Sequence, residues 1–179
     1  METYTLKIGE VTRELPIIAL SDSLSIASFV ILGDTEIVEA SATKLKDKLP
    51  EIDVLITAEA KGIPLVYELA KQLNIPRYIV ARKSIKPYMN NPLTKTVNSI
   101  TTQKEQTLCL DGDDAAFIKG KRVALIDDVI STGESLHALE ALVEKAGANI
   151  IAKAAILAEG DAKDRKDIIF LEHLPLFTK

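Results

Sequence analysis

Short apolar runs alternate with amphipathic segments through most of this chain. Mostly apolar runs occur at 52–57, 77–81, 123–126 and 150–158, a pattern typical of buried parallel strands. In segments 34–48, 63–73 and 134–146 the apolar residues recur at the spacing of one helix face. Strands that alternate with helices predict an α/β fold in which a parallel twisted sheet carries helices on both faces.

The polar positions divide this pattern into elements. Residues 1–20 predict two short extended pieces separated by a polar break at 10–14, and Asp34 or Thr35 is expected to cap helix 34–48. Residues 83–96 predict a long polar loop, 97–110 a hairpin that turns at 103–106, and 111–114 a turn. Because ligands collect at the carboxyl ends of parallel strands, functional residues are expected just after each strand.

Composition and charge narrow the range of function classes. A chain of 179 residues suits one domain, and a net charge of -4 gives no reason to expect nucleic-acid binding. Cys109 is the single cysteine, so no intramolecular disulfide can form, and its apolar neighbours predict a buried position. Apolar runs are too short for a membrane span and no signal peptide is recognised, so a cytoplasmic protein without a membrane partner is expected.

The stretch from Val123 to Ser135 carries the clearest chemistry. An apolar strand leads into Asp127 and Asp128, then into Ser-Thr-Gly, and then into a helix. The glycine permits a tight turn, and the free N–H groups of the helix start favour a phosphate, to which the hydroxyls add donors. Two carboxylates suit hydroxyl groups better than a phosphate. A sugar with free hydroxyls and a terminal phosphate satisfies both parts of this stretch.

This stretch resembles the signature of type I phosphoribosyltransferases, enzymes that transfer ribose 5-phosphate from phosphoribosyl pyrophosphate to an acceptor. The resemblance extends over roughly residues 24 to 176. It implies that Asp127 and Asp128 bind the ribose hydroxyls as catalytic residues. It also implies that a cradle for the 5′-phosphate is formed by Ser131, Thr132, Gly133, Glu134 and Ser135.

Two further segments match the family's pyrophosphate site. After strand 52–57 comes Ala60-Lys61-Gly62, where members often have Ser-Arg-Gly, and the resemblance implies a cis peptide at Ala60–Lys61. Arg82-Lys83-x-x-Lys86 resembles the cationic pattern of purine-using members, with Lys86 also a catalytic candidate. Three cations at this position suit a leaving group that gains negative charge. The segment from about 84 to 106 is expected to be a mobile lid.

The family resemblance also predicts one domain, residues 1–179, with a core at about 34–160 and a small hood from about 1–33 and 160–179. The base is expected to contact Phe29 and Glu159 in or near the hood. Adenine-type members usually have a glutamate where Thr101 stands, which removes that candidate acid or base. Xanthine-type members resemble Val97 to Thr102 but carry a lysine where this chain has Ala158-Glu-Gly160. Because that lysine is missing, adenine is the favoured acceptor over xanthine or hypoxanthine.

The resemblance implies Mg²⁺ as cofactor, with Asp127 and Asp128 contacting it through water rather than as direct ligands, and it implies a homodimer. The expected partners are phosphoribosyl pyrophosphate and a purine base. One alternative is a regulator that binds phosphoribosyl pyrophosphate without turnover. Another is a receiver-like or phosphatase-like α/β domain phosphorylated on Asp127 or Asp128, which the Ser-Thr-Gly helix entry disfavours.

Overall fold

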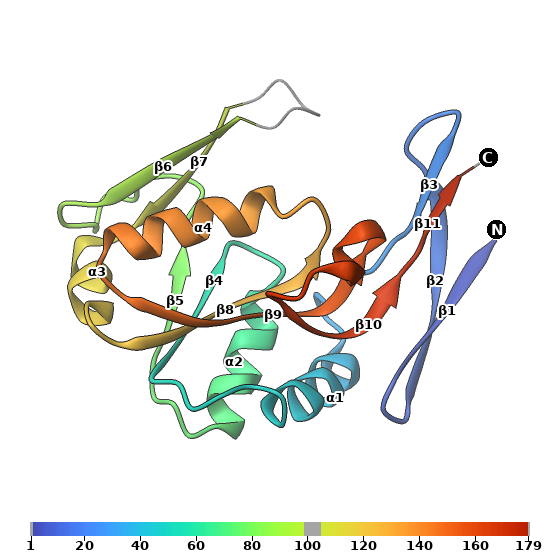
Figure 1. Cartoon of the computed structure of the whole chain (residues 1–179), viewed down its shortest axis with the longest axis horizontal. Helices are drawn as coiled ribbons and strands as arrows, with labels where there is room; N and C mark the ends of the chain where they lie inside the picture. Colours follow the sequence, from blue (N-terminus) through green and yellow to red (C-terminus); the bar gives the residue numbers. More distant parts are fainter. Residues whose placement is uncertain (1, 99–104, 179) are drawn as a thin grey trace.

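The computed structural model describes residues 2–98 and 105–178, and its centre is a five-stranded parallel sheet (Figure 1). The strands lie in the order β10–β9–β8–β4–β5, and every neighbouring pair is parallel. Their bounds are β4 (Val54–Ala58), β5 (Tyr78–Ala81), β8 (Arg122–Ile130), β9 (Asn149–Glu159) and β10 (Ile169–Leu174). This order confirms the α/β fold that the alternating pattern predicts.

Helices cover both faces of the sheet (Figure 1). Helices α1 (Thr35–Lys46) and α2 (Ile63–Gln72) lie on one face, and α4 (Glu134–Lys145) lies on the other. Short α3 (Gly112–Ile118) contributes its buried residues to the same core layer as α4. The core is therefore split by the sheet into two apolar layers, because each helix buries only the stripe that faces the strands.

A second sheet forms the hood beside the parallel sheet. Its strands are antiparallel in the order β1 (Thr3–Ile8), β2 (Val11–Ala19), β3 (Leu24–Ala27) and β11 (Leu176–Thr178). Both ends of the chain lie at this hood (Figure 1). Only Gly9 and Glu10 separate β1 from β2, so the break is shorter than predicted. Strand β10 joins the parallel sheet, which therefore extends beyond the expected core boundary at 160 to Leu174.

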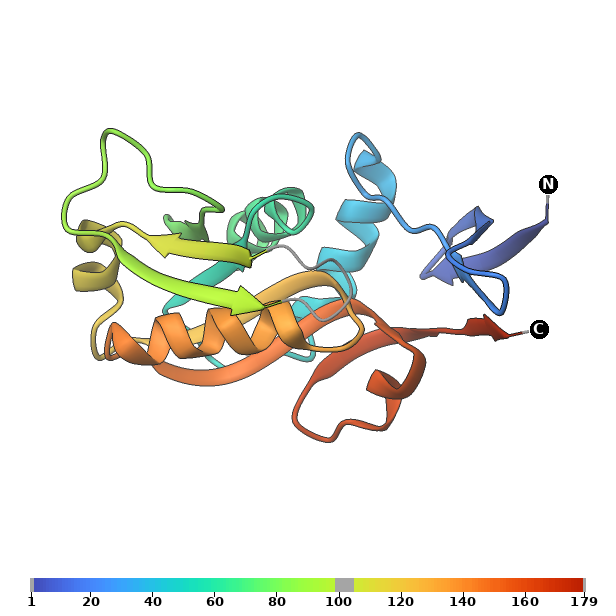
Figure 2. The same cartoon turned by 90° about the horizontal axis from the view of Figure 1, so that it is seen from above.

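A two-stranded hairpin, β6 (Leu93–Asn98) with β7 (Glu105–Leu110), lies along α4 (Figure 2). The predicted turn at 103–106 falls partly outside the described residues, and so does Thr101. A 3₁₀ turn, η1 (Gly160–Asp164), follows β9. Among helices in the described ranges, none combines the length and the apolar character that a membrane crossing requires.

Three local predictions are wrong. The predicted loop at 83–96 ends early, because strand β6 begins at Leu93. Residues 111–114 do not form a simple turn but begin helix α3. The Asp111 carboxylate caps this helix by accepting the Asp113 N–H at 3.4 Å, and the side chains of Ala115 and Ile118 are buried in the core. Strand β8 does not end at Ile126 but continues to Ile130, because the pairing with β9 persists past the acids. Asp127 and Asp128 therefore stand on a strand and not in the loop behind it.

Candidate active site

Three loops meet where β5, β4 and β8 end side by side. The chain passes from β4 to β5 on one side of the sheet and returns with β8 on the other side of β4. The pairing of β4 with β8 ends at Ile56 and Leu125. Beyond this point β8 pairs with β9 alone. Such a divergence of neighbouring strands opens a crevice at the carboxyl edge, the usual ligand site of an α/β sheet.

A cavity of about 210 Å³ occupies this crevice. It collects side chains from the end of β4, from the segment after β5, from β8, from α4 and from the hairpin. The lining residues are Ala58, Glu59, Ala60, Lys61, Lys83, Val97, Gln106, Leu108, Asp127, Asp128 and Ser135. Two lysines and three carboxylates face one space, which gives the cavity both cation and hydrogen-bond acceptor chemistry.

A smaller cavity of about 120 Å³ lies next to it, at the start of α4. Its lining comprises Asp127, Val129, Ile130, Ser131, Thr132, Gly133, Glu134, Ser135 and Leu136. Asp127 and Ser135 belong to both cavities, so the two spaces adjoin. The structure therefore brings together the residues predicted for the phosphate cradle and the paired acids.

The paired acids differ in their surroundings. Asp127 accepts the backbone N–H of Asp128 at 2.8 Å, and burial together with the adjacent Asp128 carboxyl raises the pKa of Asp127 well above its ordinary value. The Lys61 ammonium acts in the opposite direction on that pKa. The Asp128 side chain is buried, and its Oδ2 atom has no hydrogen-bond partner within the described part of the chain. A buried acceptor of this kind calls for a donor or a cation from a ligand.

The start of α4 lets the backbone approach a bound anion closely. Gly133 has φ +81°, a left-handed conformation that only glycine adopts readily, and it has no side chain to cap the helix. A Cβ atom at this position would lie 2.6 Å from Nη1 of Arg165. The N–H of Glu134 makes a long hydrogen bond of 3.5 Å to the Thr132 hydroxyl, so the first turn of α4 is suited to bind an anion in the small cavity.

The loop between β4 and α2 places Lys61 in the larger cavity and buries Gly62 behind it. A Cβ atom on Gly62 would collide with the hydroxyl of buried Thr57, so this position also requires glycine. The cis peptide bond lies at Glu59–Ala60, one residue before the predicted Ala60–Lys61. The predicted position of the cis peptide is therefore wrong by one residue.

The three predicted cations after β5 have different contacts. Lys83 lines the larger cavity. Arg82 forms an ion pair with Glu59 at 3.2 Å, and its Nη1 donates to the Tyr88 hydroxyl at 2.6 Å. Lys86 donates from Nζ to the Ser84 hydroxyl at 2.7 Å and is not among the described residues that line the cavity. The structure thus brings one of these cations into the cavity beside Lys61.

Comparison with known proteins agrees with this geometry. The sequence pattern of the phosphoribosyl transferase domain family matches residues 34–174. The chain belongs to the phosphoribosyltransferase family. A hypoxanthine/guanine phosphoribosyltransferase of Methanococcus voltae is 33% identical over 141 residues, covering 78% of this chain and 71% of the relative. A xanthine phosphoribosyltransferase of Chloroflexus aurantiacus is 32% identical over 128 residues, 69% of this chain and 58% of the relative.

A solved structure supports the fold independently. The adenine phosphoribosyltransferase of Thermoanaerobacter pseudethanolicus superposes with a TM-score of 0.73 at 22% identity, covering 89% of this chain and 95% of that one. At this identity the likeness concerns the fold alone. Together with the sequence relatives it confirms the type I fold and the purine branch of the phosphoribosyltransferase family that the sequence predicts.

The residues predicted to contact the base lie outside both cavities. Phe29 is 6% exposed and packs in the core layer of α1 and α2. Glu159 ends β9, directly before Gly160, which packs against Leu176 of the hood. Glu159 therefore stands where the phosphoribosyltransferase core meets the hood, whereas most of the Phe29 ring is covered by protein.

Sequence reasoning did not select Glu59 or Gln106, although both line the larger cavity. Gln106 pairs across the hairpin with Val97, which also lines it. Strand alternation in the hairpin could have placed these two residues on one face. Glu59 offered a signal in its position directly after β4, between the strand and the predicted loop Ala60–Gly62.

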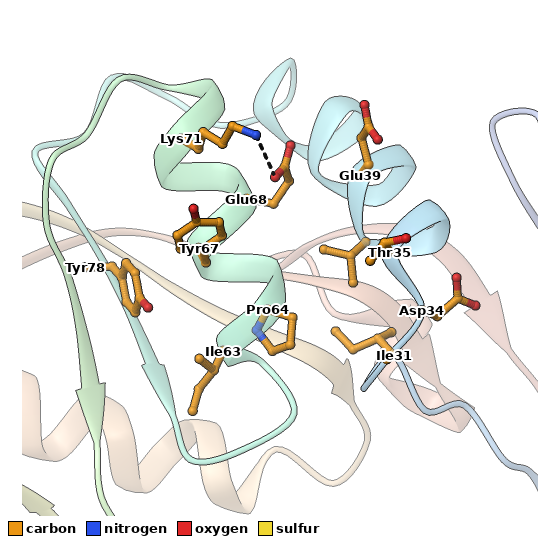
Figure 3. A pocket seen from close by; sticks show the side chains of 12 residues that line it. Ile31, Asp34, Thr35, Glu39, Ile63, Pro64, Tyr67, Glu68, Lys71 and Tyr78 are labelled. Atoms are coloured by element: carbon orange, nitrogen blue, oxygen red, sulfur yellow. Dashed lines mark ion pairs between the residues drawn. The ribbon is translucent and has the colours of Figure 1, made fainter.

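A cavity of about 490 Å³, larger than the two described above, is a different feature. It lies between α1 and α2, with Tyr67 and Tyr78 on one side and Ile31 on the other, and its rim carries the Lys71–Glu68 ion pair of 3.9 Å (Figure 3). Its walls are mainly apolar, and none of the residues predicted for the phosphoribosyltransferase site lines it. Size alone therefore does not identify the site in this molecule.

Proposed function

We propose that this protein transfers ribose 5-phosphate from phosphoribosyl pyrophosphate to a purine base, giving a nucleoside monophosphate and pyrophosphate. The observation that carries the proposal is the pair of adjoining cavities that share Asp127 and Ser135. One cavity presents hydroxyls and the N–H groups of a helix start, and the other presents carboxylates and lysines. A phosphorylated sugar with a pyrophosphate group has complementary chemistry in the same order.

In this mechanism the first turn of α4 and the hydroxyls of Ser131, Thr132 and Ser135 hold the 5′-phosphate. Asp127 and Asp128 accept hydrogen bonds from the ribose hydroxyls and so fix the sugar ring. Lys61 and Lys83 face the departing pyrophosphate and stabilise its growing negative charge. The purine nitrogen attacks the anomeric carbon as the bond between that carbon and the pyrophosphate oxygen breaks. The placement of the two reactants therefore matters more than proton transfer.

Magnesium fits the residues at this site. Carboxylate oxygens are suitable neighbours for Mg²⁺, and the unpartnered Oδ2 of Asp128 supplies one in the cavity. The described residues contain no group of three His, Cys, Asp or Glu that could hold a metal alone, so Asp127 and Asp128 would hold it through water together with the substrate. Bound Mg²⁺ would offset the charge on the leaving pyrophosphate.

The hairpin and the segment before it are proposed as a lid. Val97, Gln106 and Leu108 already line the larger cavity from the hairpin side. A small movement of this segment would exclude water from the reacting centre and could bring Lys86 toward the pyrophosphate. Homodimer formation remains a prediction from the family resemblance, and a cytoplasmic location remains a prediction from the sequence.

Adenine and a 6-oxopurine are the two candidates for the acceptor base. Adenine is predicted because a donor for a 6-oxo group is missing at 158–160, and Glu159 can only accept hydrogen bonds when ionised. The two sequence relatives named above are, by contrast, a hypoxanthine/guanine and a xanthine enzyme. A 6-oxopurine is therefore the second candidate for the acceptor, supported by a specific observation.

The test incubates the protein with phosphoribosyl pyrophosphate, Mg²⁺ and each of adenine, hypoxanthine, guanine and xanthine, with separation of nucleotides by chromatography. We expect one class of base to give the monophosphate. Tight binding of phosphoribosyl pyrophosphate without a nucleotide product would favour the regulator instead. Neither binding nor product would refute the proposal as a whole.

A further inference from the structure

Glu59 makes a set of contacts that the proposed reaction does not use. Its Oε2 accepts the backbone N–H of Lys83 at 2.9 Å, and its Oε1 lies 3.2 Å from Nη2 of Arg82. The Arg82 guanidinium is the main cause of a lowered pKa at Glu59, so the carboxylate is ionised at neutral pH. Its own N–H donates to the Ala81 carbonyl at 2.9 Å, which fixes the loop beside the end of β5.

These partners form a site for an anion. A guanidinium and a backbone N–H that reach two oxygens of one group can bind a carboxylate or a phosphate in the same way. Arg82 and Lys83 are also the cations that the sequence predicts for pyrophosphate. In the present structure the position is taken by the side chain of Glu59, which lines the 210 Å³ cavity, whereas Arg82 stands behind it and is not among the lining residues.

We propose that Glu59 is an internal anion that occupies the pyrophosphate position in the ligand-free protein and is displaced when pyrophosphate binds. The inference rests on the proposed function, whose pyrophosphate subsite it describes. Displacement frees the Arg82 guanidinium and the Lys83 N–H for phosphate oxygens. When pyrophosphate leaves, the carboxylate returns to both groups, so Glu59 weakens product binding and speeds product release.

The surroundings of Arg82 allow such an exchange. Both residues of the pair are about one quarter to one third exposed, with side-chain values of 31% for Arg82 and 25% for Glu59. Pairs of this exposure are weak and reversible. The Arg82 backbone is held by two hydrogen bonds with Cys109, of 2.8 and 2.7 Å, so the residue stays in place while its side chain changes partner.

A simpler role makes the opposite prediction. If Glu59 only positioned Arg82 and Lys83 for pyrophosphate, its removal would weaken pyrophosphate binding. If Glu59 competes with pyrophosphate for those groups, its removal strengthens binding. Glu59→Gln separates the two, because glutamine has the same size and can still accept the Lys83 N–H but carries no charge.

The experiment measures binding of inorganic pyrophosphate with Mg²⁺ to the full chain by calorimetry, together with product inhibition by pyrophosphate. Glu59→Gln is expected to bind about 1.5- to fivefold more tightly, the range of one partly exposed ion pair. Glu59→Asp keeps the charge but shortens the side chain, and it should give a smaller increase. This second variant also keeps the test valid if the glutamine variant does not fold.

The matched control is Glu51→Gln, which also removes one charge from a Glu–Arg pair. Glu51 is 85% exposed and pairs with Arg122, the first residue of β8, at the opposite edge of the sheet. It should leave pyrophosphate binding unchanged. Unchanged or weaker binding by both Glu59 variants overturns the inference, whereas a wild-type protein that does not bind pyrophosphate contradicts the proposed function instead.

Discussion

Asp127 is ionisable at a position where the fold disfavours its charge. Burial and the neighbouring Asp128 raise its pKa, although the residue is expected to accept ribose hydroxyls as a carboxylate. Sites that bind charged or polar ligands commonly lower the stability of the ligand-free protein in this way. The charged carboxylate of Asp127 should therefore lower the stability of the ligand-free protein while it supports activity.

We expect Asp127→Asn to unfold at a higher temperature than the wild type and to lose about ten- to a hundredfold in activity. Because the pKa of Asp127 is raised in the folded state, the destabilisation is complete at pH values above the folded-state pKa. It is absent at pH values below the unfolded-state pKa near 3.8, where Asp127 is protonated in both states. For a domain of this size, each 1 kcal/mol of destabilisation that the substitution removes should raise the melting temperature by about 2–4 °C.

Scanning calorimetry between about pH 4 and pH 8 checks this sign, because the gain in melting temperature should shrink toward the acid end. A variant less stable than the wild type at neutral pH would show that Asp127 stabilises the ligand-free fold.

Gly62 is required by its contact with one side chain. We expect Gly62→Ala to lower the free energy of unfolding by about 1–3 kcal/mol, because its Cβ collides with the Thr57 hydroxyl inside a closely packed region. Removing that hydroxyl in the double variant Thr57→Ala/Gly62→Ala should recover most of the loss relative to Thr57→Ala alone. Urea unfolding of the four proteins measures the coupling, and additive effects would refute the contact as its cause.

At the scale of elements, spacing was enough for the long helices and for the strands of the parallel sheet. Helix α4 runs over Glu134–Lys145 against a predicted 134–146, and Asp34 caps α1 as one of two candidates. The segment 111–114 was misjudged because aspartate and glycine favour turns and helix caps equally, and only the burial of Ala115 and Ile118 decides between them. Short β3 and β11 gave no periodic signal, because runs of four and three residues are too short to show alternation.

The candidate site divides in the same way. The predicted phosphate cradle is a continuous stretch, so the sequence alone indicates that its residues lie together, and they line one cavity. The partners of the predicted cations could not be predicted from the sequence. Arg82 pairs with Glu59, which lies on another loop, and Lys86 donates to Ser84, two residues away. A list of positive charges does not show which of them already has a partner.

The helix start at Gly133 allows a controlled comparison. We expect Gly133→Ala to cost about 1–2 kcal/mol of stability from the left-handed backbone. It should also weaken binding of ribose 5-phosphate about tenfold or more, since Gly133 lies directly before α4 and relief of its backbone strain moves the N–H groups of the predicted cradle. Gly120→Ala is the control, with φ +75° and nothing within 4 Å of its Cβ. Equal losses of phosphate binding in the two variants would exclude a local effect.

At the scale of the whole molecule, an ion pair connects the hood to the core. Arg13 of β2 donates to both oxygens of Asp34, at 2.7 and 2.9 Å, and to Glu36 at 2.7 Å. Asp34 also accepts the Ile37 N–H at 3.2 Å, so one carboxylate caps α1 and holds the hood strand. The Arg13 guanidinium is the main cause of a lowered pKa at Asp34.

Asparagine at this position keeps the cap and removes the charge. Asp34→Asn is therefore expected to lose less than about 1 kcal/mol, and Asp34→Ala about 1 kcal/mol more. Because the pKa of Asp34 is lowered, its ionic contribution is complete above the unfolded value and lost as the pH falls through the folded value. Urea unfolding should show this loss in the wild type but not in Asp34→Asn, and identical pH dependence would argue against the connection.

The pairing of β3 with β11 has a consequence for protein engineering. The hood sheet is assembled from two separate stretches of the chain, whose strands pair where Leu24–Ala27 lies antiparallel to Leu176–Thr178. A chimaera that takes its hood from a relative must therefore receive both stretches at once. If only one stretch were exchanged, β3 and β11 would come from different proteins. Their facing side chains would then not match, and the edge between them would be exposed. Exchange of the hood between relatives therefore requires the transfer of both segments.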